Sequence, residues 1–178
     1  MYNSWTDFRG RVDFERFGQD SEHVLVIEDI ELPKALKRDK DLRTQYGALC
    51  YRMMRGKVQV LLITSRTRRR WIIPKGWPMS DRSPAEAASL EAWEEAGVSG
   101  KVSGDVVGYF PYTKYGDGLG PDLPCVVCVF PLKVKSLAKE FPERHERRRK
   151  WFSPKQASKK VAEPDLRQLL RDFKPPKS

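Results

Sequence analysis

Apolar residues cluster in short runs along the middle of the chain, as they do in strands. Residues 46–54 and 58–65 are two such runs, and Gly56 lies in the turn between them, which predicts a tight pair of strands. Alternation is incomplete in the second run, V-Q-V-L-L-I-T-S, and this favours a strand that is buried on both faces. Residues 125–132 predict a central strand, and residues 101–112 predict one more, with glycines that mark bulges.

A helix is predicted between Ser83 and Gly97. Ser83 can cap its start, Pro84 suits the first helical position, and Glu86 stands where a capping box needs it. Gly97 supplies a left-handed stop. The start and the end of this helix are therefore both marked in the sequence.

Three glutamates, Glu91, Glu94 and Glu95, share one face of this predicted helix. Spacings of three and four residues put them within an arc of about 100°. Like charges so close are unfavourable, and a divalent cation bound between them would reverse that cost. Because the ligands are hard oxygens, Mg²⁺ is the expected ion, with Mn²⁺ as the alternative. Spacing alone is more typical of a solvated helix face, so the choice of a metal site depends on the residues around the glutamates.

The C-terminal part predicts two further helical segments. Ser153 and Pro154 repeat the capping signal, and residues 165–173 carry apolar side chains at 166, 169, 170 and 173, the spacing of a helix that packs on a core. The order of elements predicts an α/β fold with a mixed sheet between helices. We expect an N-terminal extension over residues 1–42, one folded domain over 43–174 and a tail over 175–178.

Net charge and composition limit the classes of ligand that the chain is expected to bind. The chain has 178 residues and a net charge of +10, which favours polyanionic ligands such as phosphorylated small molecules or nucleic acid. Three cysteines and the lack of a long apolar run predict a cytoplasmic protein that does not bind membranes. Cys125 and Cys128 are expected to be core residues rather than zinc ligands, because side chains three apart on a strand point to opposite faces.

Basic residues precede the predicted helix. The loop S-R-T-R-R-R at residues 65–70 reads either as a solvated loop or as a phosphate-binding loop that faces the glutamates, since arginine binds phosphate oxygens bidentately. Arg70 and Lys75 are candidates for that role. Lys114 opens a glycine- and proline-rich loop of about a dozen residues, which is long enough for a lid or a substrate loop.

The stretch from Trp71 to Val98 resembles the Nudix box, G-x5-E-x7-R-E-U-x-E-E-x-G-U, where U is an aliphatic residue. The positions that match are Gly76, Glu91, Glu94, Glu95, Gly97 and Val98. Arg82 stands in place of the first glutamate and Leu90 in place of the arginine. In that family the E-x-x-E-E glutamates bind metal ions and one of them often acts as base. The resemblance implies a Nudix α/β/α sandwich and an Mg²⁺-dependent pyrophosphohydrolase, and the two departures imply reduced activity.

Residues 46–173 are similar to the diphosphoinositol polyphosphate phosphohydrolase branch of the superfamily. This likeness implies that Ser65, Arg66, Lys75 and Arg147 bind phosphates. Thr44 and Tyr46 stand where that branch carries basic residues, so the expected substrate stays broader: a nucleoside or dinucleoside polyphosphate, or a diphosphoinositol polyphosphate.

Two alternatives remain open at the level of the sequence. Aromatic residues interleaved with basic ones permit stacking of RNA bases, which would suit a 5′-end pyrophosphohydrolase. These aromatics are Trp71, Trp77, Tyr109, Tyr112 and Trp151. A polyanion-binding module with weakened catalysis is the other alternative. The general base is not assigned: each of the three glutamates, Glu143 and Glu146 is a candidate, and the oligomeric state is left open.

Overall fold

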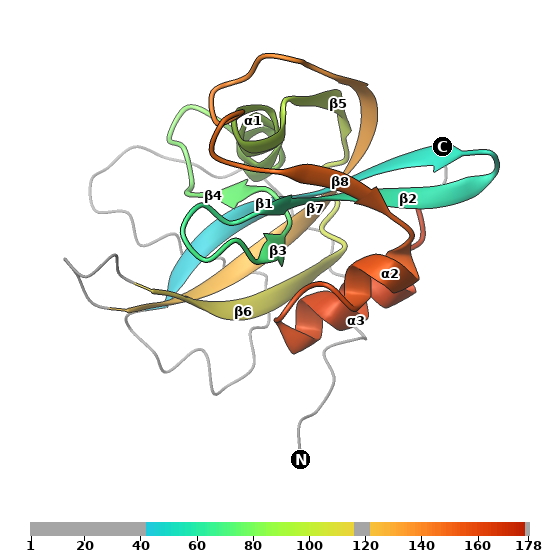
Figure 1. The fold of residues 1–178 in the computed structure, drawn as a ribbon. Coiled ribbons are helices and arrows are strands. Elements are labelled where there is room, and N and C mark those ends of the chain that lie inside the picture. Colours follow the sequence, from blue (N-terminus) through green and yellow to red (C-terminus); the bar gives the residue numbers. More distant parts are fainter. Residues whose placement is uncertain (1–41, 116–121, 177–178) are drawn as a thin grey trace.

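The structure, a computed structural model, describes residues 42–115 and 122–176. A mixed sheet of eight strands lies between helices, with α1 on one side and α2 and α3 on the other (Figure 1). The helices are α1 Pro84–Ala96, α2 Pro154–Ser158 and α3 Pro164–Asp172. The predicted α/β/α sandwich with a mixed sheet is confirmed. Of the predicted N-terminal extension, residues 1–41 lie outside the described residues, as do residues 177–178 of the tail.

One parallel strand pair at its centre makes the sheet mixed. The strands are β1 Arg43–Met54, β2 Lys57–Thr64, β3 Trp71–Ile72, β4 Lys75–Gly76, β5 Val98–Val102, β6 Gly108–Lys114, β7 Leu123–Leu137 and β8 Arg149–Phe152. Their order is β3-β2-β1-β7-β5, with β4 on β1, β6 on β7 and β8 on β2. β1 runs parallel to β7, whereas β2 and β4 run antiparallel to β1.

The β1–β2 hairpin forms where the sequence predicted it. Arg55 and Gly56 both have positive φ, 50° and 73°, as the tightest hairpin turns require. Val60 and the residues that follow it to the end of β2 are buried, which agrees with a strand covered on both faces.

The prediction of a single strand over residues 101–112 is wrong, because two strands, β5 and β6, cover this part of the chain. β5 and β6 both pair with β7, and the chain leaves the ladder between them. Ser103 donates its N–H to the carbonyl of Pro131 at 2.9 Å, and Val107 donates to the carbonyl of Val129 at 2.8 Å. Pro131 has no N–H to return, so a regular ladder cannot continue past it.

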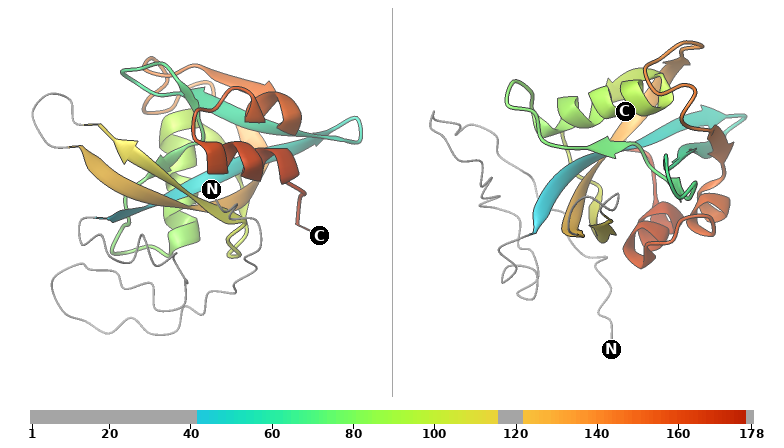
Figure 2. Two further views of the ribbon diagram at one scale, coloured as in Figure 1. Left: turned by 90° about the horizontal axis from the view of Figure 1, so that it is seen from below. Right: turned by 60° about the vertical axis from the view of Figure 1, so that its left-hand side comes forward.

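Two hydrophobic clusters lie on the two sides of the sheet, and Figure 2 shows the layers that they join. The alanines of α1 pack with Phe130 and Cys128 in the first cluster. Leu166 and Leu170 of α3 pack with Val127 in the second cluster. The apolar stripe of α3 and the cysteines are thus core residues, as predicted. In residues 42–115 and 122–176 no helix has the length and apolarity needed to cross a membrane.

Candidate active site

Helix α1 is held at both ends by the residues that predicted it. Ser83 accepts a hydrogen bond from the Glu86 N–H at 3.4 Å, and the Ser83 N–H donates to Glu86 Oε2 at 2.9 Å. Gly97 ends the helix with φ of 63°, in the left-handed region. With both ends fixed, Glu91 lies against Gly76, and Glu95 contacts Lys75 and Arg147. Glu94 is partly buried.

Glu95 is the most enclosed of the three glutamates, since only 6% of it is exposed. Its Oε2 accepts the backbone N–H of Lys75 at 3.0 Å, and its Oε1 pairs with Nη2 of Arg147. Burial raises the pKa of this carboxyl, while Arg147 and Lys75 act in the opposite direction. The conformation of the Glu95 side chain is therefore fixed by the Lys75 N–H on one oxygen and by Arg147 on the other.

Arg147 joins three segments of the chain. Its side chain is 6% exposed, and besides Glu95 it pairs with Glu143 through Nε. Its Nη1 donates to the backbone carbonyl of Thr64, at the end of β2, at 3.1 Å. A guanidinium with its donors satisfied in this way is a rigid support for the carboxylates around it.

Glu91 lies over the glycine of β4. A Cβ at Gly76 would lie 1.9 Å from the carboxyl carbon of Glu91, so a residue with a side chain there would displace that carboxyl. The pKa of Glu91 is raised to about 7, chiefly by burial and then by the charges of Glu95, Glu94 and Glu143. We call Glu91, Glu94, Glu95 and Glu143 the carboxylate cluster.

The carboxylate cluster fits a divalent cation by its chemistry. Its donors are hard oxygens. Burial and then the charges of Glu95, Glu94 and Glu143 raise the pKa of Glu91, and a bound cation would stabilise the ionised carboxylates against both. Among the described residues no three acidic, histidine or cysteine side chains are already assembled around one point. Mg²⁺ commonly keeps several waters and binds through one or two carboxylates, so a site that is completed by water and substrate suits it.

The residues predicted to bind phosphate are divided between two places. Arg66 lies at the carboxylate cluster, with Nη1 3.7 Å from Glu143 and 3.6 Å from Glu146. Ser65 accepts the backbone N–H of Arg70 at 3.0 Å and so shapes the loop. Lys75 extends its Nζ over the ring of Tyr112, 4.6 Å from the centroid.

Arg70 and Lys114 have other partners. Arg70 pairs with Glu163 at the start of α3, at 3.7 Å, rather than with a glutamate of α1. The expectation that the whole loop faces the carboxylate helix is therefore wrong for Arg70. Arg69, with φ of 53°, turns the backbone just before it. Lys114 Nζ lies over the ring of Trp77, 4.7 Å from the centroid.

Some contributors could not be read from the sequence. The carbonyl of Thr64 accepts from Arg147, and the Thr64 hydroxyl accepts from the Arg148 N–H at 3.0 Å, across more than eighty residues of chain. Glu163 lies far along the chain from the Nudix-like stretch, and no spacing signal marked it. Arg82 is exposed and lies beside Asp81 at 3.8 Å, and Leu90 is partly buried.

Comparison with known proteins settles the family. The NUDIX domain family matches residues 43–173. The chain belongs to the Nudix family. Nudix hydrolase 13, mitochondrial, from Arabidopsis thaliana is 30% identical over 151 residues, which are 76% of this chain and 75% of that protein. Diphosphoinositol polyphosphate phosphohydrolase 3-alpha from Mus musculus is 34% identical over 115 residues, 64% of this chain and 65% of that protein.

Solved structures agree on the fold. The Ap4A hydrolase of C. elegans superposes with a TM-score of 0.52 and 22% identity, covering 73% of this chain and 94% of that one. The MutT protein of Methanosarcina mazei Go1 superposes with a TM-score of 0.56 and 20% identity, covering 75% of this chain and 93% of that one. The prediction of a Nudix-family hydrolase is confirmed, and Nudix enzymes generally use divalent metal cations.

Proposed function

We propose that this protein hydrolyses a phosphoanhydride in a nucleoside or dinucleoside polyphosphate, or in a diphosphoinositol polyphosphate, with Mg²⁺ or Mn²⁺. The observation that carries the proposal is the environment of Glu91. Its half-buried carboxyl has a pKa raised to about 7, first by burial and then by the charges of Glu95, Glu94 and Glu143, on a protein whose net charge is +10. Negative charge concentrated in this way within a basic protein suits a cation that bridges to an anionic substrate.

Glu91, Glu94 and Glu95 would hold the metal ion. A bound divalent cation neutralises phosphoryl oxygens and lowers the pKa of a water. Arg147 and the Lys75 N–H keep Glu95 in one position. Glu91 is our candidate base, because its half-buried carboxyl lies beside the other glutamates of the site, where the cation would hold the attacking water.

Arg66 supplies the positive charge on the open side of the site. Its side chain is 60% exposed while its guanidinium stays within 3.7 Å of Glu143. An exposed guanidinium can exchange a weak carboxylate contact for the oxygens of a phosphate. Arg66 therefore holds the substrate next to the metal ligands, in the role that the family resemblance implied.

A substrate panel tests this proposal. The purified protein is assayed with Mg²⁺ and with Mn²⁺ on diadenosine polyphosphates, nucleoside diphosphate derivatives, inositol pyrophosphates and a 5′-diphosphorylated RNA oligonucleotide. We expect turnover of a small molecule and its loss in EDTA. Preference for the RNA would favour the 5′-end alternative, and no turnover by folded protein would remove the proposal.

A catalytically weakened binding module is the second candidate. Arg82 favours it, because it places a positive charge that pairs with Asp81 where the Nudix pattern has a glutamate. If the two departures limit catalysis, Arg82→Glu combined with Leu90→Arg raises the rate at least tenfold, or about 1.4 kcal/mol in barrier. An unchanged rate in the double variant would show that these positions are not limiting.

A further inference from the structure

The β1–β2 hairpin projects beyond the rest of the sheet, as Figure 1 and Figure 2 show. Arg55 and Gly56 form its turn, and the two residues before the turn are exposed methionines, Met53 at 50% and Met54 at 41%. Neighbouring side chains of a strand point to opposite faces of the sheet. The tip of the hairpin therefore presents an apolar side chain to solvent on each face.

The strands at this end of the sheet contribute positive charge alone. β1, β2, β5 and β7 contain no acidic residue. The exposed cations of the hairpin turn and of the neighbouring strands are Arg55, Lys57, Lys101, Lys133 and Lys135. We call these five residues, together with Met53 and Met54, the hairpin surface.

The register of the strands brings part of this surface together. Lys133 of β7 is paired with Tyr51 of β1 on one side and with Lys101 of β5 on the other. Met53 lies two residues after Tyr51 and so shares its face of the sheet. Like charges directly opposite each other on neighbouring strands are destabilising. A negatively charged ligand that covers Lys101 and Lys133 would relieve their repulsion.

Contacts at the base of the hairpin fix its direction. Arg52 donates its Nε to Gln59 Oε1 at 2.9 Å, and its guanidinium lies 4.1 Å from the centroid of the Trp151 ring. The ring of Tyr51 packs edge-on against Phe173, with centroids 5.3 Å apart. A tip that is presented by a fixed base loses little conformational freedom when it binds.

We propose that the hairpin surface docks the protein on an anionic lipid bilayer, with Met53 and Met54 entering the interface and the cations facing the lipid phosphates. Such binding grows with the apolar area that is buried and with attraction to anionic lipids. The expectation that the protein does not bind membranes rested on the lack of a long apolar run, and a surface contact needs none.

The chemistry of the tip favours lipid over nucleic acid. Single-stranded nucleic acid is bound by stacking its bases on aromatic rings. The exposed large side chains of the hairpin are both methionines, which are flexible and aliphatic and suit a fluid apolar layer. The exposed aromatic residues, Trp77, Trp93 and Tyr115, belong to other parts of the chain.

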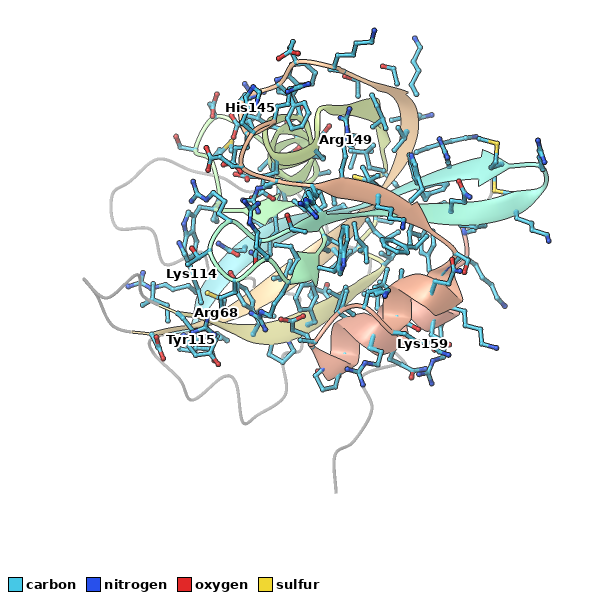
Figure 3. The ribbon with its side chains drawn as sticks, in the orientation of Figure 1. Arg68, Lys114, Tyr115, His145, Arg149 and Lys159 are labelled. Atoms are coloured by element: carbon cyan, nitrogen blue, oxygen red, sulfur yellow. The ribbon has the colours of Figure 1, made fainter. Side chains whose placement is uncertain are left out.

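Docking through the hairpin leaves the active site open. β1 pairs with β4 at Tyr46, beside the carboxylate cluster, and Met54 lies eight positions further, which is roughly 26 Å of extended strand. Figure 3 shows Lys114 and Tyr115 at the end of the sheet opposite to the hairpin. This inference goes beyond the proposed function and does not depend on it.

Co-sedimentation with lipid vesicles tests the proposal. The full chain is mixed with vesicles of phosphatidylcholine alone or of equal parts phosphatidylcholine and phosphatidylglycerol, at low and at high salt. We expect at least tenfold stronger partition into the anionic vesicles, which weakens as salt screens the charges. Met53→Ser combined with Met54→Ser should lower this partition at least tenfold. Leucine at both positions keeps the apolar area and should leave the partition unchanged.

Lys101→Gln combined with Lys133→Gln tests the contribution of charge and should lower partition into anionic vesicles at least tenfold. The control is Lys159→Gln combined with Lys160→Gln, which removes two exposed lysines in and after α2 and should bind within twofold of wild type. Near-ultraviolet circular dichroism shows that each variant is folded. Equal partition of wild type into the two kinds of vesicle, or equal losses in the two lysine pairs, would overturn the proposal.

A single-stranded oligonucleotide provides the competing outcome. If the Lys101 and Lys133 variant loses affinity for the oligonucleotide and keeps its affinity for vesicles, the surface serves nucleic acid and the proposal fails. Turnover of soluble substrate should be equal in wild type and in every hairpin variant, because none of the changed residues belongs to the carboxylate cluster. Vesicle binding by a protein that hydrolyses nothing would remove the proposed function and leave the docking surface in place.

Discussion

At the scale of single residues, the geometry of the site depends on the three groups that accept hydrogen bonds from the guanidinium of Arg147. It faces two carboxylates and one carbonyl from a position that is almost fully enclosed. Removing one member of a buried ion pair leaves an uncompensated charge, and this costs far more than removing an exposed pair. Glu95 and Glu143 are therefore joined by a residue that lies outside the Nudix-like stretch.

Arg147→Ala should lower the free energy of unfolding by about 3–5 kcal/mol, because Glu95 and Glu143 lose their common partner in a buried setting. Urea unfolding followed by circular dichroism measures this change. Arg144→Ala is the control, since Arg144 pairs with the exposed Glu140, and it should cost about 1 kcal/mol or less. Equal losses in the two variants would mean that Arg147 is not a structural support.

Glu91 makes the stability of the metal-free protein depend on pH. Its folded pKa of about 7 lies above its ordinary value of 4.5, so the folded state binds this proton more tightly than the unfolded state does. The resulting stabilisation is complete below pH 4.5 and is lost as the pH rises through about 7. The Glu91→Gln variant has no carboxyl to titrate at this position, so it does not lose this stability as the pH rises.

Unfolding in EDTA between pH 4.5 and 8 measures that difference. Relative to wild type, Glu91→Gln should gain about 1 kcal/mol across this range, because solvent screens a partly exposed carboxylate and reduces the effect. Glu140→Gln, at an exposed position, should follow the wild-type profile. Parallel profiles for Glu91→Gln and wild type would contradict the raised pKa.

At the scale of elements, β4 and α1 form one unit, because the glycine of β4 leaves the space that Glu91 occupies. Gly76→Ala would bring a methyl group to 1.9 Å from the carboxyl carbon of Glu91. The carboxyl is the free end of a flexible side chain, so it can swing away at small cost to the fold. It would then leave the position from which it serves the site.

Gly76→Ala should therefore lower Mg²⁺ affinity and turnover at least tenfold while lowering the free energy of unfolding by about 1 kcal/mol or less. Gly104→Ala is the matched control, because a Cβ there meets nothing within 4 Å. Isothermal titration with Mg²⁺ and a urea unfolding curve on each variant give the two quantities. Loss of folding in Gly76→Ala, or full Mg²⁺ affinity, would contradict this account.

Local signals in the sequence were sufficient for most elements and insufficient for the contacts between them. Ser83, Glu86 and Gly97 act within a few residues, so the helix and its ends were predictable. The break between β5 and β6 depends on Pro131, and Glu163 meets Arg70 only after the chain has folded back. Such contacts join residues that no periodicity or spacing relates.

At the scale of the whole molecule, a small acidic site belongs to a protein whose net charge is strongly positive. The net charge of +10 attracts phosphorylated ligands over a distance, whereas the carboxylate cluster repels them on contact unless a cation is present. This combination favours a substrate that binds together with a divalent cation, as the proposed function requires. It also predicts that high salt weakens substrate capture more than it changes the chemical step.

The turnover of the best substrate at increasing Mg²⁺ concentration, compared between wild type and Glu91→Gln, tests the central claim most directly. Glu140→Gln serves as the control for loss of an acidic residue elsewhere. If Glu91 binds the ion and accepts the proton, Glu91→Gln loses at least 100-fold in kcat, equivalent to about 2.7 kcal/mol, and excess Mg²⁺ does not restore it. A Glu91→Gln enzyme within twofold of wild type at every Mg²⁺ concentration would contradict the account.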